Sequence, residues 1–145
     1  MTELNDINNQ PAPNPSPQER DALTQMVMAL FDHWGLDEEV RFSLLGLPDA
    51  TPEQLLQYRA GHPLQAGEPL SRASLLLSIH KNVRLLYPDN SDLAYTWMSK
   101  KNKAFDNRTP IDWAAEKGLG GLIYVREYLV DVVEARFRGA PFKRN

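Results

Sequence analysis

The chain has 145 residues, 42% of them hydrophobic, and a formal net charge of −3, so it is long enough to bury the core of one domain or of two small lobes. The absence of cysteine excludes disulfide bonds, thiolate zinc sites and a cysteine nucleophile. The N-terminus lacks a signal-peptide pattern, and the apolar runs are too short to cross a bilayer. We therefore expect a soluble cytoplasmic protein with no membrane partner.

Residues 1–17, MTELNDINNQPAPNPSP, combine prolines with small polar residues and offer almost nothing to bury. This composition is typical of a disordered arm. The first helix is expected to begin at Ser16, because a serine N-cap followed by Pro17 and Glu19 forms the capping-box pattern. Apolar residues then recur at helical spacing up to Trp34, and Gly35 ends this predicted helix.

Two short helices are predicted next, over residues 37–46 and 51–61. Together with the first helix they form a predicted lobe over residues 18–66, in which helix, glycine-containing turn and helix have the spacing of a helix-turn-helix. The candidate DNA-binding residues on its last helix are Gln54, Gln57, Tyr58 and Arg59.

Charge weighs against DNA binding by this lobe. Residues 1–60 contain ten acidic and three basic residues, whereas residues 70–110 contain seven basic and three acidic ones. A nucleic-acid surface in the first half would therefore work against its own electrostatic field. Two interpretations of this lobe therefore stay equally open. It is a helix-turn-helix that binds DNA, or it keeps the shape of one without binding DNA.

The second half also reads as helical. A long helix is predicted over 70–87, a shorter one over roughly 91–100, one from Thr109-Pro110 to Gly118, and a last amphipathic helix over 122–137. No strand alternation is apparent, so the expected fold is all-α with about seven helices. We assign residues 67–138 to a second domain and residues 139–145 to a basic tail.

Catalytic chemistry has little support in the sequence. None of the three histidines lies at metal-ligand spacing, so no metal or other cofactor is expected. The serines near His80 lack a glycine-rich elbow, and we expect His80 to be a hydrogen-bonded, partly buried imidazole. Gly118, Gly120 and Gly121 are better explained by a corner between helices than by a phosphate loop. We therefore expect no catalytic residues and no enzymatic activity.

The segment WMSKKNKAFDNRTPIDW, residues 97–113, places aromatic residues around a basic turn. Trp97, Phe105 and Trp113 are expected to pack in the core, where large rings contribute most. Asn102 and Asn107 suit tight turns. The basic side chains would then lie at the rim of a rigid turn, which favours a binding edge for another protein. These side chains belong to Lys100, Lys101, Lys103 and Arg108.

Several ordered motifs resemble the Xre/MbcA/ParS-type antitoxin family over roughly residues 20–130. They are the helix LLSIHKNVRLLYPDN, the connector with YTWM, NKAF and TPIDW, and the final helix with VREYL. The segment GLPDATPEQL is similar to the Xre-like helix-turn-helix of that family. Where members commonly have glycines after the phenylalanine, this chain has Asp106-Asn107. Asparagine tolerates the left-handed backbone that glycine adopts, so the fold is expected to be kept.

The resemblance implies an antitoxin of a type II toxin–antitoxin system. Its partner would be a cognate protein toxin, often a RES-type, NAD-consuming one, and the antitoxin would act as a homodimer within a hetero-oligomer and repress its own operon by binding operator DNA. Toxin contact would belong to the C-terminal domain, through Asn102, Phe105, Arg108 and Arg126. From charge we add Lys100, Lys101 and Lys103, and from the basic C-terminal segment EARFRGAPFKRN we add Arg138, Phe142 and Lys143. The alternative is an orphan helix-turn-helix regulator that dimerises through its C-terminal half.

Overall fold

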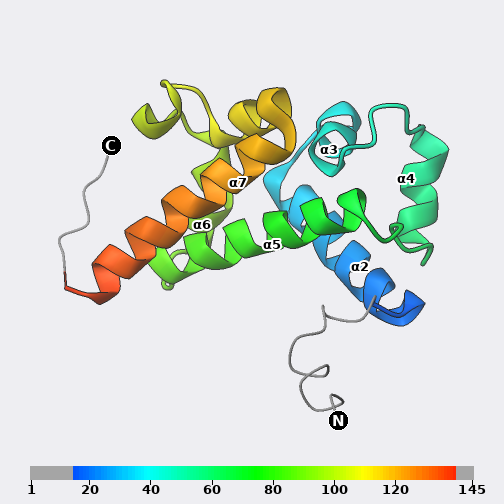
Figure 1. Cartoon of the computed structure of the whole chain (residues 1–145), viewed down its shortest axis with the longest axis horizontal. Helices are drawn as coiled ribbons and strands as arrows, with labels where there is room; N and C mark the ends of the chain where they lie inside the picture. Colours follow the sequence, from blue (N-terminus) through cyan, green and yellow to red (C-terminus); the bar gives the residue numbers. More distant parts are fainter. Residues whose placement is uncertain (1–14, 140–145) are drawn as a thin grey trace, which may run out of the picture.

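The computed structural model describes residues 15–139, and over this range the protein is all-helical, with no sheet. Figure 1 shows the arrangement of its elements. The helices are α2 (Pro17–Trp34), α3 (Glu38–Leu45), α4 (Pro52–Arg59), α5 (Glu68–Leu86), α6 (Ser91–Thr96) and α7 (Pro110–Phe137), with 3₁₀ turns η1 (Trp97–Ser99) and η2 (Lys103–Phe105). The predicted all-α fold is confirmed. Residues 1–14 and 140–145, which include most of the predicted arm and basic tail, lie outside the described residues.

Local sequence signals set most helix ends. At the start of α2 the Ser16 hydroxyl accepts a hydrogen bond from the Glu19 amide at 3.1 Å, and the Glu19 carboxylate accepts one from the Ser16 amide at 3.0 Å. This reciprocal pair satisfies two amides that the first helical turn leaves without partners. Gly35 and Gly46 end α2 and α3 in the left-handed conformation. The capping box and the stop at Gly35 were predicted and are confirmed, and the predicted helix over residues 37–46 ends at Gly46.

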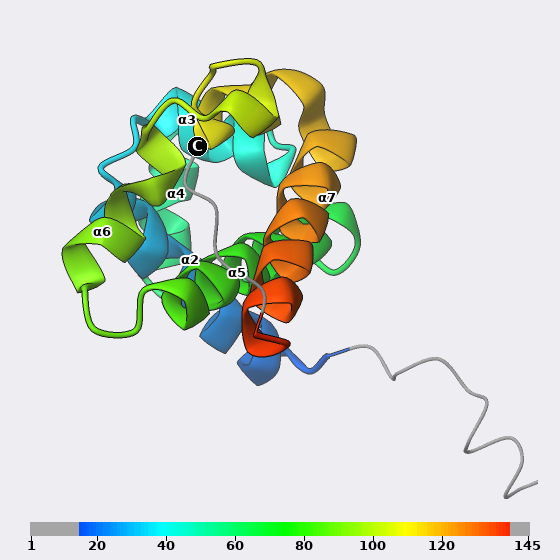
Figure 2. The same ribbon diagram turned by 90° about the vertical axis from the view of Figure 1, so that its left-hand side faces the viewer.

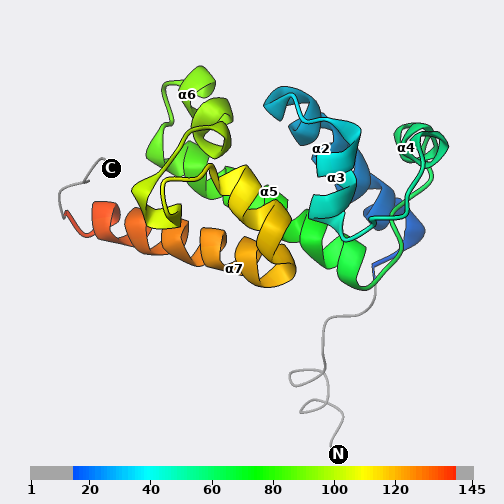
Figure 3. The ribbon, with the colours of Figure 1, turned by 90° about the horizontal axis from the view of Figure 1, so that it is seen from above.

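Helix α5 runs through the middle of the molecule and joins its two ends. In Figures 1 and 3, α2, α3 and α4 gather around the N-terminal part of α5, while α6 and α7 lie towards its C-terminal part. Figure 2 shows α6 and α7 on opposite sides of α5. The buried residues of α5 recur every three or four positions, so the helix presents one apolar face to its neighbours. They are Leu70, Ala73, Leu76, Ile79, Val83 and Leu86.

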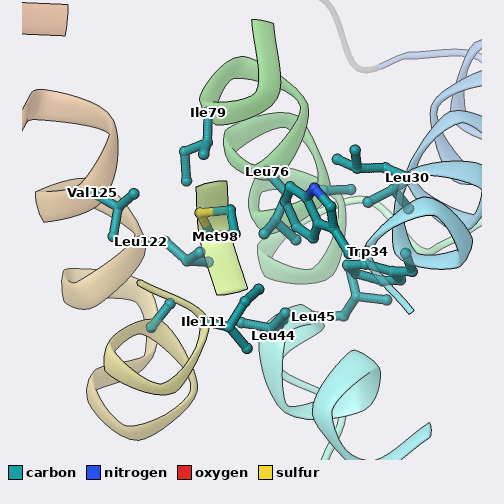
Figure 4. Packing of buried hydrophobic residues seen from close by; sticks show 14 of the residues in the cluster. Leu30, Trp34, Leu44, Leu45, Leu76, Ile79, Met98, Ile111, Leu122 and Val125 are labelled. Carbon is teal, nitrogen blue, oxygen red and sulfur yellow. The ribbon is translucent and has the colours of Figure 1, made fainter. Parts of the chain in front are cut away.

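One hydrophobic cluster fills the space between these helices. Figure 4 shows side chains of α2, α3, α5, η1 and α7 meeting there, among them Trp34, Leu44, Leu76, Met98 and Leu122. Residues of both predicted lobes therefore share a contiguous core. The division at residues 66 and 67 stays a prediction.

Helix α7 is broken near its start. Gly118 has φ 68° and ψ −143°, which is outside the helical region, so a short N-terminal segment and a long C-terminal segment meet there at a kink. A Cβ on Gly121 would lie 3.2 Å from the Ala114 Cα and from the Trp113 carbonyl oxygen. The predicted glycine corner is thus confirmed, and its two segments account for the expected count of about seven helices. The helix predicted over 91–100 instead ends at Thr96 and continues as the 3₁₀ turn η1.

No helix among residues 15–139 is long and apolar enough to cross a membrane.

Candidate protein-docking site

The connector between η1 and α7 is a closed, hydrogen-bonded loop organised by Asn102. The Asn102 side chain accepts a hydrogen bond from the Ala104 amide at 2.9 Å. The main-chain carbonyl of Asn102 accepts hydrogen bonds from the Phe105 and Asn107 amides at 3.0 and 3.1 Å. Its own amide donates to the Arg108 carbonyl at 3.1 Å, which closes the base of the loop. Asn102 therefore has a local structural role that matches its predicted suitability for a tight turn.

The loop turns through two left-handed residues. Asp106 has φ 57° and Asn107 has φ 61°, the only non-glycine residues with positive φ in the described range. Asp and Asn are the residues that tolerate this backbone best after glycine, because their short side chains bond to the local main chain. The expectation that asparagine adopts the left-handed backbone at this turn is confirmed, and Asp106 adopts it as well.

Phe105 anchors the loop to the protein. Its side chain is fully buried, and its ring lies 5.3–6.1 Å, centroid to centroid, from four other rings in edge-to-face geometry. Such aromatic pairs add to the stabilisation from buried area. These rings form what we call the aromatic cluster: Trp97, Phe105, Trp113, Tyr124 and Tyr128. The predicted core packing of Trp97, Phe105 and Trp113 is confirmed. Phe105 holds the connector of residues 100–109, which we call the docking loop, against the core.

Helix α7 holds the outer side of the cluster. The Tyr124 hydroxyl donates to the Ala104 carbonyl at 3.3 Å, and the Lys117 ammonium lies 4.5 Å from the centre of the Trp113 ring. Sequence reasoning did not single out Tyr124, Tyr128 or Lys117. A signal was present, because Tyr124 and Tyr128, like Trp113 and Lys117, are four residues apart and so share a helical face.

The positive side chains of the loop divide into two groups. Lys100, Lys101 and Lys103 are exposed and form no ion pair with the described residues. We call these three residues the lysine edge. Arg108 instead pairs with Glu116 and donates to the Asp112 carbonyl at 3.2 Å. The lysine edge therefore supplies unpaired positive charge on a rigid base, whereas Arg108 helps to hold the loop on α7.

The remaining predicted toxin-binding residues lie elsewhere. Arg126 is on α7 but lines a groove against α5 with Ser71, Ser74 and Ser78, and it pairs with Glu127 at 2.7 Å. Arg138, which is exposed, caps the end of α7 beside Glu134. Phe142 and Lys143 lie outside the described residues.

The predicted DNA-binding residues are partly engaged within the protein. The Gln54 side chain accepts from the Thr51 amide at 2.8 Å. Arg59 donates to both carboxylate oxygens of Asp32, at 2.6 and 2.9 Å, and Arg41 donates to the same carboxylate at 2.8 Å. The hydrogen bonds from Arg59, followed by those from Arg41, hold the pKa of Asp32 well below its usual range.

Of the other two candidates, Tyr58 is half-buried, and burial raises the pKa of its hydroxyl. Gln57 is exposed. Two of the four candidate side chains, Gln54 and Arg59, are therefore engaged in contacts within the lobe.

The prediction of a hydrogen-bonded imidazole at His80 is wrong. Both ring nitrogens are buried, and neither has a hydrogen-bond partner among the described residues. The ring instead stacks on Tyr95 at 4.8 Å and meets the edge of Trp34 at 6.3 Å, and His33 stacks on the other face of Tyr95 at 4.2 Å. Burial, with smaller contributions from Arg84 and His33, lowers the pKa of His80 to about 4. Aromatic packing has taken the place of the expected polar partner.

The described residues contain no group of three or more histidine, aspartate or glutamate side chains that could hold a metal ion.

A comparison with known families matches the part of the chain that contains this loop. Residues 83–131 match a family model described as the antitoxin Xre/MbcA/ParS C-terminal toxin-binding domain, which covers about a third of the chain. A search of curated proteins found no match. The matched range includes the end of α5, the docking loop, the whole aromatic cluster and most of α7. The resemblance seen in the sequence is therefore confirmed over residues 83–131, where the chain matches the toxin-binding domain of Xre/MbcA/ParS antitoxins.

Proposed function

We propose that the protein is an antitoxin that binds a cognate protein toxin through the lysine edge and the adjoining surface of α7. The observation that carries this proposal is the coincidence of the matched toxin-binding domain with a rigid loop that presents three unpaired cations. A loop already fixed by hydrogen bonds and by the buried Phe105 ring loses little conformational entropy on binding. Unpaired surface charge in turn favours a partner of opposite sign and guides its approach.

The partner we propose is a RES-type, NAD-consuming toxin, the kind that the resemblance implies. Neutralisation would take place in the cytoplasm, within a hetero-oligomer that contains an antitoxin homodimer. The tail from Arg138 onwards, with Phe142 and Lys143, would compete for a toxin cleft that binds an anionic dinucleotide, because it combines positive charge with aromatic residues. Deletion of residues 138–145 tests the tail alone: unchanged inhibition of the toxin would exclude this role.

Charge reversal of the lysine edge tests the main proposal. The variant Lys100→Glu, Lys101→Glu, Lys103→Glu should fail to rescue cells that express the protein encoded by the adjoining reading frame, and it should fail to co-purify with that protein. The matched control replaces the same three lysines with arginine, which keeps the charge and should keep rescue. Rescue by the glutamate variant at wild-type level would contradict the proposed docking surface.

Operator binding by the N-terminal lobe is a second proposal, and the observation that favours it is the pair of short helices α3 and α4 with Gln57 exposed on the second. The contact of Arg59 with Asp32 and the acidic charge of the lobe oppose it. A gel shift with the upstream operon DNA at fixed salt, comparing the wild-type protein with Gln57→Ala, measures it directly. A specific shift without any toxin partner would favour the orphan-regulator alternative.

A further inference from the structure

The outward face of α5 carries two grooves that meet at Ser78. One groove, of about 430 Å³, lies against α7 and is lined by Ser71, Ser74, Leu75, Ser78 and Arg126. The other, of about 540 Å³, lies against α2. Residues 74, 78, 81 and 85 follow one another at helical spacing, so the two grooves run along one face of the same helix. We call this surface the α5 trench.

The α2 side of the trench has an apolar floor. Met26, Leu77 and Leu85 line it, and the side chains of Met26 and Leu85 are 55% and 40% exposed. Large apolar side chains with this exposure lose contact with water when a partner covers them, and their burial stabilises the contact in proportion to the area covered.

The rim of the trench is positive. Lys81, Arg84 and Arg126 line the two grooves, and neither groove is lined by an aspartate or glutamate among the described residues. Lys81 and Arg84 form no ion pair in the described part of the chain, and Arg126 pairs with its neighbour Glu127. An apolar floor between unpaired cations is complementary to an amphipathic helix with acidic flanks, which places apolar residues every three or four positions.

Two observations select the occupant. Arg84, Leu85 and Arg126 all lie within the residues matched by the toxin-binding domain. A contact between the trench and the same surface of a second copy would join two faces that carry the same positive residues and no acidic ones, and like charges at an interface oppose binding. We propose that the α5 trench is a second docking surface for the toxin, which inserts an acidic amphipathic helix there. This inference rests on the proposed antitoxin function and identifies a contact region separate from the lysine edge.

The test measures the affinity of full-length variants for the product of the adjoining reading frame. Leu85→Asp should weaken binding about tenfold or more, which is about 1.4 kcal/mol, because it places a charge in an apolar contact that the partner buries. Leu56→Asp is the matched control, since Leu56 is 66% exposed on α4, away from the trench. It should bind as the wild type does. Arg84→Glu should also weaken binding, whereas Arg84→Lys should preserve it, and thermal melts establish that each variant is folded.

Different results separate this inference from the proposed function. Wild-type affinity in both Leu85→Asp and Arg84→Glu, with binding lost in the lysine-edge variant, would overturn the trench and leave the antitoxin function standing. No binding by the wild-type chain would overturn both. If Leu85→Asp instead halves the molar mass of the free protein in light scattering and leaves the toxin affinity unchanged, the occupant is a second copy and the proposal is wrong.

Discussion

Gly118 decides the course of α7 at a single residue. Its backbone, at φ 68° and ψ −143°, lies in a region that side chains with a Cβ rarely adopt. The kink directs the short first segment of α7, with Trp113, onto Phe105 and the long second segment, with Tyr124, onto the same ring from another side. One glycine therefore allows a single helical stretch to cover two sides of the docking loop.

Substitution of Gly118 should show how much the unusual backbone at this position costs any residue with a Cβ. Gly118→Ala should lower the free energy of unfolding by about 1–3 kcal/mol, because alanine must adopt the strained backbone. The control is Gly120→Ala, two residues away, where the added Cβ meets nothing within 4 Å and φ is negative. It should be neutral or stabilising by up to about 1 kcal/mol. Urea denaturation of the two variants measures both values, and equal effects would contradict this account of the corner.

His80 should make stability depend on pH in mild acid. The folded-state pKa of about 4 lies below the value of about 6.5 expected in the unfolded chain, so between these values the unfolded state binds a proton that the folded state does not. The free energy of unfolding should therefore fall as the pH falls from about 6.5 to about 4. His80→Phe, which keeps an aromatic ring between Tyr95 and Trp34, should remove most of this fall in the free energy of unfolding. The control His62→Gln, in an exposed loop, should leave the fall in place.

Asp32 should make stability depend on pH over a separate, more acidic range. Its pKa is lowered in the folded state, so its contribution to stability is present above about pH 4 and is lost as the pH falls further. A pH titration of stability in His80→Phe should therefore keep its decline below about pH 4. Persistence of the decline between about pH 6.5 and pH 4 in that variant would show that His80 is not the group responsible for it.

These residues also show where sequence reasoning stopped. The left-handed pair Asp106-Asn107 and the glycine corner were predicted, because both depend on backbone preferences of the residues themselves. The environment of His80 was not, because its neighbours Tyr95 and Trp34 come from other helices and no local pattern joins the three. The Arg59–Asp32 contact, which spans 27 residues, was missed for the same reason.

At the scale of the element, the docking loop is held by the two short 3₁₀ turns and by the buried Phe105 ring, which packs against the other rings of the aromatic cluster. The tight turn itself was predicted from its asparagines, as were the helix starts at Ser16 and Thr109, because capping and turn chemistry are local. The way in which Tyr124 and Tyr128 complete the cluster required knowing that α7 folds back over the loop. Hydrophobic periodicity alone predicts a buried helical face but not which loop it will cover.

Removal of the Phe105 ring should therefore destabilise the whole docking loop. Phe105→Ala should lower the free energy of unfolding by about 3–5 kcal/mol, because it removes a fully buried ring and leaves a cavity. Phe137→Ala at the end of α7, where the ring is 67% exposed, should change it by less than about 0.5 kcal/mol. Chemical denaturation compares the two, and the loss of the near-ultraviolet aromatic signal in Phe105→Ala alone would identify the cluster as the affected site.

At the scale of the whole molecule, charge divides the chain into two parts, whereas the hydrophobic core does not. The first 60 residues are strongly acidic and residues 70–110 are basic, yet one hydrophobic cluster extends through both parts by way of α5. The acidic lobe is therefore joined to the basic part through apolar contacts. The lysine edge and two positive residues of the α5 trench, Lys81 and Arg84, belong to the basic part, so a partner with acidic surfaces would be attracted to that part and repelled from the lobe.

This arrangement predicts how salt should act on complex formation with the product of the adjoining reading frame. The association rate constant should fall as ionic strength rises from about 0.05 to 0.5 M, because screening shortens the range over which the exposed lysines attract a partner. Replacement of Lys100, Lys101 and Lys103 with glutamine should slow association and make it less sensitive to salt. Leu85→Asp should instead act mainly on dissociation, because its apolar contact forms only after the partners have met. Stopped-flow or surface-binding kinetics separate the two effects, and a salt-independent association rate in the wild-type protein would contradict electrostatic guidance by the lysine edge.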